Sequence, residues 1–246
     1  MQYRTFGRTG LPVSVVSMGG NRLGDPGVDP AQWPPLVRRA LELGDTFFDT
    51  SNSYNQGRSE SVLGEVTSGH ATPVVIATKG GVPVETNDFP RRRFTAEAVE
   101  EAVAHSLVRL RREAIDLYML HSPTVEQLES EDWAVAVARL KAAGAIRWFG
   151  ISTPDHASGI WALRHGADFL QIEYNLLDPT ADAELLPLAA EVNAGIMVRV
   201  PLARGLLSGK FAIGQPLSPE VQWRRPSGDA LQLRLRRVEQ LRFLER

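Results

Sequence analysis

The stretch Phe48-Asp49-Thr50-Ser51-Asn52-Ser53-Tyr54 places an aspartate at the end of an apolar run and a tyrosine five residues later. Two further apolar runs, 74–78 and 115–120, are each followed by a polar residue, Lys79 and His121. In a parallel barrel the carboxyl ends of the strands, with the loops that follow them, open at one face. The spacing therefore predicts that these four polar side chains meet in one site.

Apolar runs rich in β-branched and aromatic residues alternate with segments of helical periodicity. The expected strands are 14–18, 46–50, 74–79, 115–120, 146–151, 169–173 and 196–200. The expected helices are 33–43, 59–66, 95–112, 125–143, 154–164 and 181–192. Strict alternation predicts parallel strands covered by helices, an α/β fold of the TIM-type (β/α) barrel class. Residues 3–13 are expected to form a separate N-terminal hairpin that turns at Thr9-Gly10.

Seven strands are one fewer than a closed (β/α)₈ barrel requires, so we expect an incomplete barrel. The last segment has an apolar stripe that needs a partner: Leu231, Leu235, Val238, Leu241 and Leu244. Three explanations stay open. The chain is a fragment that lacks one strand–helix unit, or a partner supplies that unit, or the fold is open there. Residues 214–228 are expected to form a long irregular connection. Residues 1–246 are expected to form a single barrel domain with its C-terminal unit missing or truncated. An open edge could pair with another copy as a homo-oligomer.

Composition narrows the classes of function. The chain has 27 basic and 29 acidic residues and a net charge of −2, which favours neither nucleic acid nor an anionic membrane. No apolar run has the length of a signal peptide or a membrane span, so a cytoplasmic protein is expected. The sequence has no cysteine and no cluster with metal-ligand spacing. Disulfides, thiolate catalysis and a metal site are therefore not expected.

Several short motifs follow one another in a fixed order. They are Gly19-Gly20, Phe48-Asp49-Thr50 with Tyr54, Gly57-Arg58-Ser59-Glu60, Ile76-Ala77-Thr78-Lys79, Ser106–Leu110 with Ile115–His121, Gly150-Ile151-Ser152, Gln171–Asn175 and Pro201–Lys210. Together they resemble the aldo-keto reductase family over nearly the whole chain. The pattern is nearest to the bacterial branch that is similar to the potassium-channel beta subunits.

The resemblance implies an oxidoreductase that uses NADPH to reduce an aldehyde or ketone, a small carbonyl substrate, to an alcohol. It assigns catalytic roles to Asp49, Tyr54, Lys79 and His121. Carbonyl reduction builds negative charge on an oxygen that must be protonated, and tyrosine is a weak acid unless a nearby cation favours its ionised form. We expect Lys79 to provide that cation and Asp49 to hold it in place. We expect His121 to orient the substrate oxygen.

The resemblance also implies contacts with the nicotinamide end of the cofactor. Gly19 and Gly20 follow the first expected strand, as in the family pattern. Ser152 and Gln171 would form hydrogen bonds with the nicotinamide amide. Thr153 stands where the family often has asparagine.

Further contacts are implied for the rest of NADPH. Arg199 occupies a position where many relatives have an aromatic residue that stacks on the nicotinamide, and a guanidinium can also stack on a flat ring. Backbone groups of Pro201, Leu202 and Gly205 would wrap the pyrophosphate, and Lys210 would add a positive charge. The family's eighth strand and its 2′-phosphate ligands have no counterpart here, so NADPH rather than NADH follows from the resemblance alone.

A second class of function stays open. The absent C-terminal unit and Arg199 are the motive for an alternative, a catalytically weak or inactive barrel that binds a nucleotide or a partner. Titration with NADPH would separate the two classes, since a binding module should saturate without turnover.

Overall fold

The computed structural model describes residues 1–215 and 227–245. These residues form two compact units. The first contains Met1–Ile172 and Pro187–Met197, and the second contains Glu173–Leu186 and the described part of Val198–Arg246. The expectation of one barrel domain over 1–246 stays a prediction.

The chain begins with the expected hairpin. Strands β1 (Tyr3–Thr5) and β2 (Pro12–Ser14) pair antiparallel, and a 3₁₀ turn over Gly7–Thr9 joins them. The predicted position of the strand at 14–18 is wrong. Pro12–Ser14 forms a strand of the hairpin, and the first strand of the main sheet, β3, contains only Met18–Gly19. The valines Val15 and Val16, which suggest that strand in the sequence, are more than half exposed.

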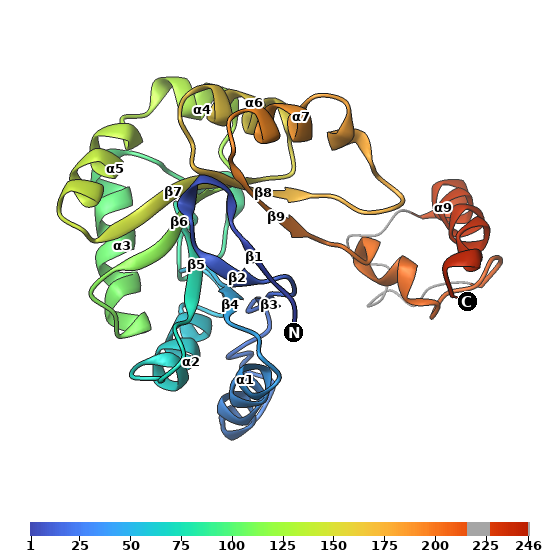
Figure 1. The fold of residues 1–246 in the computed structure, drawn as a ribbon, viewed down its shortest axis with the longest axis horizontal. Coiled ribbons are helices and arrows are strands. Elements are labelled where there is room, and N and C mark those ends of the chain that lie inside the picture. The colour runs from blue at the N-terminus through green and yellow to red at the C-terminus, as the bar shows by residue number, and fades with distance from the viewer. Residues whose placement is uncertain (216–226, 246) are drawn as a thin grey trace. The chain divides into compact units, whose positions relative to one another are not determined.

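A curved sheet of parallel strands follows, in the order β3-β4-β5-β6-β7-β8-β9 within the described residues (Figure 1). Its strands after β3 are β4 (Phe47–Asp49), β5 (Val75–Gly80), β6 (Ile115–His121), β7 (Ile146–Thr153), β8 (Phe169–Glu173) and β9 (Gly195–Arg199). Six of the seven expected strands are confirmed to within one or two residues. Sequence order equals spatial order, as the barrel class requires, so the predicted fold class is confirmed.

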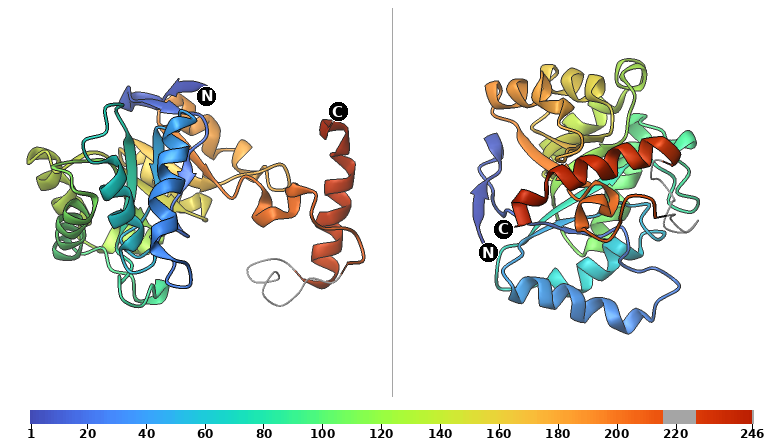
Figure 2. Two further views of the ribbon diagram at one scale, coloured as in Figure 1. Left: turned by 90° about the horizontal axis from the view of Figure 1, so that it is seen from below. Right: turned by 90° about the vertical axis from the view of Figure 1, so that its right-hand side faces the viewer.

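Helices cover the outer side of this sheet. In the first unit they are α1 (Trp33–Glu42), α2 (Arg58–Thr67), α3 (Ala96–Leu110), α4 (Val125–Ser130), α5 (Trp133–Ala142) and α6 (His156–Arg164), while α7 (Leu185–Glu191) spans the boundary between the units. Along the outside, α1 contacts α2, α2 contacts α3 and α3 contacts α5 (Figure 2). Short 3₁₀ helices occur at Pro30–Gln32, Phe89–Arg91, Thr180–Asp182, Ala203–Ser208 and Arg242–Glu245.

Two of the expected helices need correction. The segment 125–143 is two helices, because Glu131 and Asp132 leave the helix and their carboxylates accept hydrogen bonds from the Phe94 and Ala96 amides at the start of α3. The segment 181–192 begins in the 3₁₀ helix Thr180–Asp182 and is α-helical only over Leu185–Glu191. Proline lacks an amide hydrogen and is tolerated in the first turn of a helix, which is where Pro187 lies.

The core inside the sheet positions the site. Alternate strand residues, among them Phe47, Ala77 and Met119, form one buried cluster. Phe6 of the hairpin joins it, with its ring centroid 5.6 Å from that of Phe47 and 5.7 Å from that of Phe169, which are the first residues of their strands. The hairpin therefore packs against the amino ends of the strands, and polar side chains remain at the carboxyl ends.

The second unit has its own apolar cluster around helix α9 (Gly228–Gln240). Leu231 and Leu235 are buried there against three other residues: Leu177, Ala203 and Leu206. Val238 and Leu241 are partly buried against the same cluster, whereas Leu244 is 57 % exposed. Most of the predicted apolar stripe thus packs within this unit.

Two further expectations concern the remaining segments. The expected irregular connection falls largely on residues 216–226, which lie outside the described residues. Within the described ranges no helix combines the length and apolar character needed to cross a membrane.

Candidate active site

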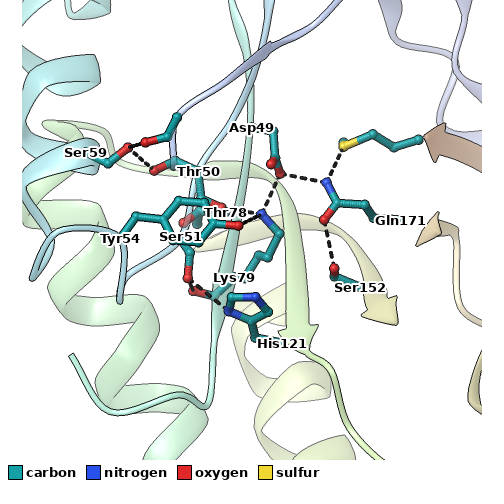
Figure 3. A network of polar contacts seen from close by, with 12 residues as sticks. Asp49, Thr50, Ser51, Tyr54, Ser59, Thr78, Lys79, His121, Ser152 and Gln171 are labelled. Atoms are coloured by element: carbon teal, nitrogen blue, oxygen red, sulfur yellow. Dashed lines mark hydrogen bonds and ion pairs between the residues drawn. The ribbon is translucent and has the colours of Figure 1, made fainter. Parts of the chain in front are cut away.

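Four polar side chains meet at the carboxyl ends of three neighbouring strands (Figure 3). Asp49 ends β4, Lys79 lies next to the end of β5, and His121 ends β6. Tyr54 comes from the loop between β4 and α2. The structure thus brings together all four residues that the sequence predicts as catalytic.

Lys79 is at the centre of this cluster and is completely buried. Its Nζ lies 2.7 Å from Asp49 Oδ1, 2.7 Å from the Thr50 carbonyl oxygen and 3.4 Å from the Tyr54 hydroxyl. An ammonium has three hydrogens to donate and accepts none, so these contacts use all of them. The Tyr54 oxygen is therefore an acceptor toward Lys79, and its own proton can be donated elsewhere.

Charge on Lys79 is maintained despite burial. Loss of solvent by itself lowers the pKa of Lys79, and this is the largest single effect. The charge of Asp49, the nearby Tyr54 and the hydrogen bonds to both outweigh it, so the pKa of Lys79 is raised overall. A buried ammonium that keeps its proton can stabilise negative charge on the tyrosine oxygen.

His121 forms the opposite side of the cluster. Its ring meets the ring of Tyr54 edge-on at a centroid distance of 5.9 Å, and that of Phe89 at 4.8 Å. Its Nδ1 lies 3.2 Å from the hydroxyl oxygen of Ser51. The imidazole is buried and held from several directions, so its ring plane is well defined.

Two of the expected cofactor ligands lie beside Asp49. Ser152 donates a hydrogen bond of 2.7 Å to Gln171 Oε1, and Gln171 Nε2 donates one of 2.9 Å to Asp49 Oδ1. Both side chains are buried, with Ser152 next to the end of β7 and Gln171 opposite it in the middle of β8. A hydroxyl and an amide offer both donors and acceptors, which is the set that a nicotinamide carboxamide requires. Thr153 instead bonds within its own turn, to the carbonyl and amide of Asp155.

Glycine is needed at Gly20 for close contact. Its amide donates to the Asp49 carbonyl at 2.6 Å, and its carbonyl accepts from Ser59 Oγ at 2.7 Å. A Cβ at Gly20 would lie 2.6 Å from that Ser59 oxygen. A Cβ at the neighbouring Gly19 would meet no atom within 4 Å. Close packing therefore requires glycine at position 20, whereas it does not require glycine at position 19.

Glu60 belongs to the quoted motif Gly57-Arg58-Ser59-Glu60, but the sequence predicts no site role for it. It is completely buried; its carboxylate accepts 2.6 Å and 2.7 Å hydrogen bonds from Thr78 Oγ1 and Arg109 Nε, respectively. Because Thr78 precedes Lys79, this contact ties α2 to the strand that carries the central ammonium. The motif is the only signal in the sequence that points to Glu60. Its partners Thr78 and Arg109 lie far from it in the sequence, so the motif does not identify them.

The remaining expected cofactor ligands belong to the second unit. Arg199 ends β9, and the loop after it holds Pro201, Leu202 and Gly205, with the exposed Lys210 further along. Val200, Ala203, Arg204 and Gly205 have positive φ angles of 57°, 48°, 56° and 91°. Backbone turns with such residues can form concave anion sites. This character fits a phosphate-binding loop, and the individual contacts stay predictions.

Comparison with known proteins bears on this site. A family model described as the aldo/keto reductase family matches residues 15–246. An uncharacterized oxidoreductase of Bacillus subtilis, YqkF, is 30 % identical over 212 residues, which are 85 % of this chain and 68 % of that protein. The NADH-specific methylglyoxal reductase of Escherichia coli is 30 % identical over 218 residues, or 83 % of this chain and 66 % of that protein.

A solved structure agrees with these matches. The aldo-keto reductase AKR11C1 from Bacillus halodurans, in its holo form, is similar with a TM-score of 0.76 and 32 % identity, covering 89 % of this chain and 71 % of that one. The chain thus spans about two thirds of the length of the curated relatives named above.

Proposed function

This chain belongs to the aldo/keto reductase family, and we propose that its site reduces an aldehyde or ketone to an alcohol with NADPH as the cofactor. The observation that supports the proposal most is the arrangement around Lys79 Nζ, which donates to Asp49, Thr50 and Tyr54 at once. This leaves the Tyr54 proton available to a substrate oxygen beside the Lys79 ammonium, whose pKa is raised.

Each residue has a defined task in the proposed reaction. Tyr54 transfers its proton to the carbonyl oxygen as negative charge develops there, and later regains a proton from solvent. Lys79 stabilises the phenolate that is left, and Asp49 keeps Lys79 charged and in place. His121 donates a hydrogen bond to the same substrate oxygen and orients it. Bound NADPH supplies the hydride that the carbonyl carbon accepts.

The proposed cofactor contacts come from two groups of residues, one for the nicotinamide carboxamide and one for phosphate. Ser152 and Gln171 would hold the carboxamide, and the loop of Pro201, Leu202 and Gly205 would hold phosphate, with Lys210 adding charge. The choice between the two nicotinamide cofactors is part of the proposal, because one relative is named as NADH-specific. Both NADPH and NADH therefore enter the test.

The test replaces Tyr54 by phenylalanine. With a panel of small aldehydes and ketones, consumption of NADPH should fall by about 10²–10⁴-fold in Tyr54→Phe, the usual contribution of general acid catalysis. Tyr3→Phe is the matched control, because the exposed Tyr3 only donates to the Gly44 carbonyl and lies in the hairpin. Fluorescence titration with each cofactor should give the same affinity for Tyr54→Phe as for the wild type.

Two outcomes would change the conclusion. Equal rates for Tyr54→Phe and the wild type would exclude Tyr54 as the acid. Saturable binding of NADPH or NADH without turnover of any carbonyl would support the alternative of a catalytically inactive nucleotide-binding barrel.

A further inference from the structure

Ser51 is a fully buried serine in the loop between β4 and α2. It lies between the two proposed catalytic residues Asp49 and Tyr54 in sequence, and the proposed function assigns it no task. Its Oγ is 3.2 Å from Nδ1 of His121, which belongs to a strand seventy residues further along. The contact therefore joins two separate parts of the site.

We propose that Ser51 is a positioning residue that selects the tautomer of His121, by donating its hydroxyl proton to Nδ1 and so keeping the imidazole proton on Nε2. The inference rests on the proposed function for its consequence in catalysis. Its structural part, the tautomer, can be tested without any turnover.

The hydrogen bonds around Ser51 are compatible with this direction. Its Oγ accepts from the Ser53 amide at 3.3 Å, and the Ser53 hydroxyl lies at 3.2 Å and can donate to it as well. Two donors fill the two lone pairs of a hydroxyl oxygen, and one proton remains to be donated. The arrangement then uses every hydrogen-bonding position of the buried Ser51 hydroxyl once.

The acceptors available to that proton differ. Nδ1 of His121 is at 3.2 Å, whereas the Lys79 carbonyl and the Asn52 side-chain oxygen are each at 3.4 Å. The Lys79 carbonyl already accepts from the Asn52 amide at 3.0 Å. Nδ1 is nearer than these two oxygens, and the Ser53 hydroxyl oxygen, also at 3.2 Å, leaves the Ser51 proton to Nδ1 when it is itself the donor.

The consequence for the reaction follows from the chemistry of imidazole. A neutral ring has one N–H, and the hydrogen bond at one nitrogen decides which nitrogen carries it. With Ser51 donating to Nδ1, Nε2 is the donor on the other side of the ring. The opposite tautomer would present a lone pair at Nε2, which cannot donate to a carbonyl oxygen and would repel developing negative charge.

The test is nitrogen NMR of protein labelled at its five histidines, with the His121 signals assigned by their loss in His121→Asn. The wild type at a pH where the ring is neutral should show a protonated Nε2 and an unprotonated Nδ1. Ser51→Ala should shift His121 toward a mixture of tautomers, and Ser51→Thr, which keeps the hydroxyl, should shift it less. The control is Ser158→Ala, because Ser158 is a buried serine of α6 that donates to Asp155, the residue before that helix.

Activity gives the second readout. In Ser51→Ala we expect kcat to fall roughly tenfold, the worth of one hydrogen bond, with the cofactor affinity unchanged. A protonated Nδ1 in the wild type, or the same tautomer in the wild type and Ser51→Ala, would overturn the inference. If the wild type turns over no carbonyl, the proposed function fails, while the NMR result still decides whether Ser51 selects the tautomer.

Discussion

The ammonium of Lys79 and the carboxylate of Asp49 are in contact at 2.7 Å across the ends of two adjacent strands, with the Lys79 side chain fully buried and that of Asp49 16 % exposed. The pair is a structural element as well as a proposed part of the active site. A buried charge depends on its partner, because water cannot replace the lost interaction.

Replacing Lys79 should therefore cost stability as well as activity. In Lys79→Met, Asp49 loses its cation, and we expect the free energy of unfolding to fall by about 3–5 kcal/mol, as for other broken buried pairs. Urea unfolding followed by circular dichroism measures this. Arg39→Met is the control, since Arg39 and its partner Glu42 are both more than 60 % exposed, and about 1 kcal/mol or less is expected there. Equal losses in the two variants would contradict the structural role of the Lys79–Asp49 pair.

The Glu60–Arg109 pair should show strong energetic coupling. Its Nε–Oε2 distance is 2.7 Å, with the Glu60 side chain fully buried and that of Arg109 21 % exposed. A double-mutant cycle with Glu60→Gln and Arg109→Met should give a coupling of about 1–3 kcal/mol. The same cycle at Arg39 and Glu42, which are both more than 60 % exposed, should give about 0.5 kcal/mol or less. Similar coupling at both pairs would show that burial of Glu60 adds nothing.

Alkaline stability should depend on Tyr118. Burial, followed by the charge of Glu60, raises the pKa of Tyr118 well above the ordinary value of 10.0. At a pH above the ordinary pKa of 10.0, the unfolded chain releases the phenol proton while the folded chain keeps it. The folded state therefore binds more protons. The free energy of unfolding must then fall as the pH rises, by up to about 1.4 kcal/mol per pH unit.

The variant Tyr118→Phe should make that decline shallower. Lys79 contributes in the same direction, because its pKa is also raised, so part of the decline should remain. Urea unfolding at several pH values above 10 measures the slope, and Tyr3→Phe, with an exposed ring, serves as the control. An unchanged slope in Tyr118→Phe would argue against proton retention by the buried phenol.

Packing of α2 on α3 should depend on glycine at position 64. A Cβ there would lie 2.2 Å from the Arg109 carbonyl oxygen and 2.7 Å from the Leu110 carbonyl carbon. Because both contacts are backbone atoms, the helices must separate, and Gly64→Ala should lower the free energy of unfolding by about 1–3 kcal/mol. In Gly27→Ala the Cβ would meet only the Asp25 side chain, at 3.4 Å, so thermal unfolding should show little change there. An unchanged free energy of unfolding in Gly64→Ala would contradict the observed contact between α2 and α3.

Local sequence is a good guide where an element depends on its own residues. The strand predicted at 169–173 has the observed bounds, since its apolar residues Phe169, Leu170 and Ile172 come directly after Asp168. The single helix predicted at 125–143 is wrong, because its break depends on contacts of Glu131 and Asp132 with the distant Phe94 and Ala96 amides. The strand predicted at 14–18 is wrong for a similar reason, since β2 pairs with β1 instead.

The sequence by itself determined the order of strands and helices and the polar residues that end the strands, because side-chain periodicity and residue type are local properties. Only the tertiary structure decided which atoms meet. The three acceptors around Lys79 come from Asp49, Thr50 and Tyr54, and Ser51 and Glu60 find their partners on β5, β6 and α3. Such contacts join residues that are far apart in the sequence, so they depend on how strands and helices pack in three dimensions.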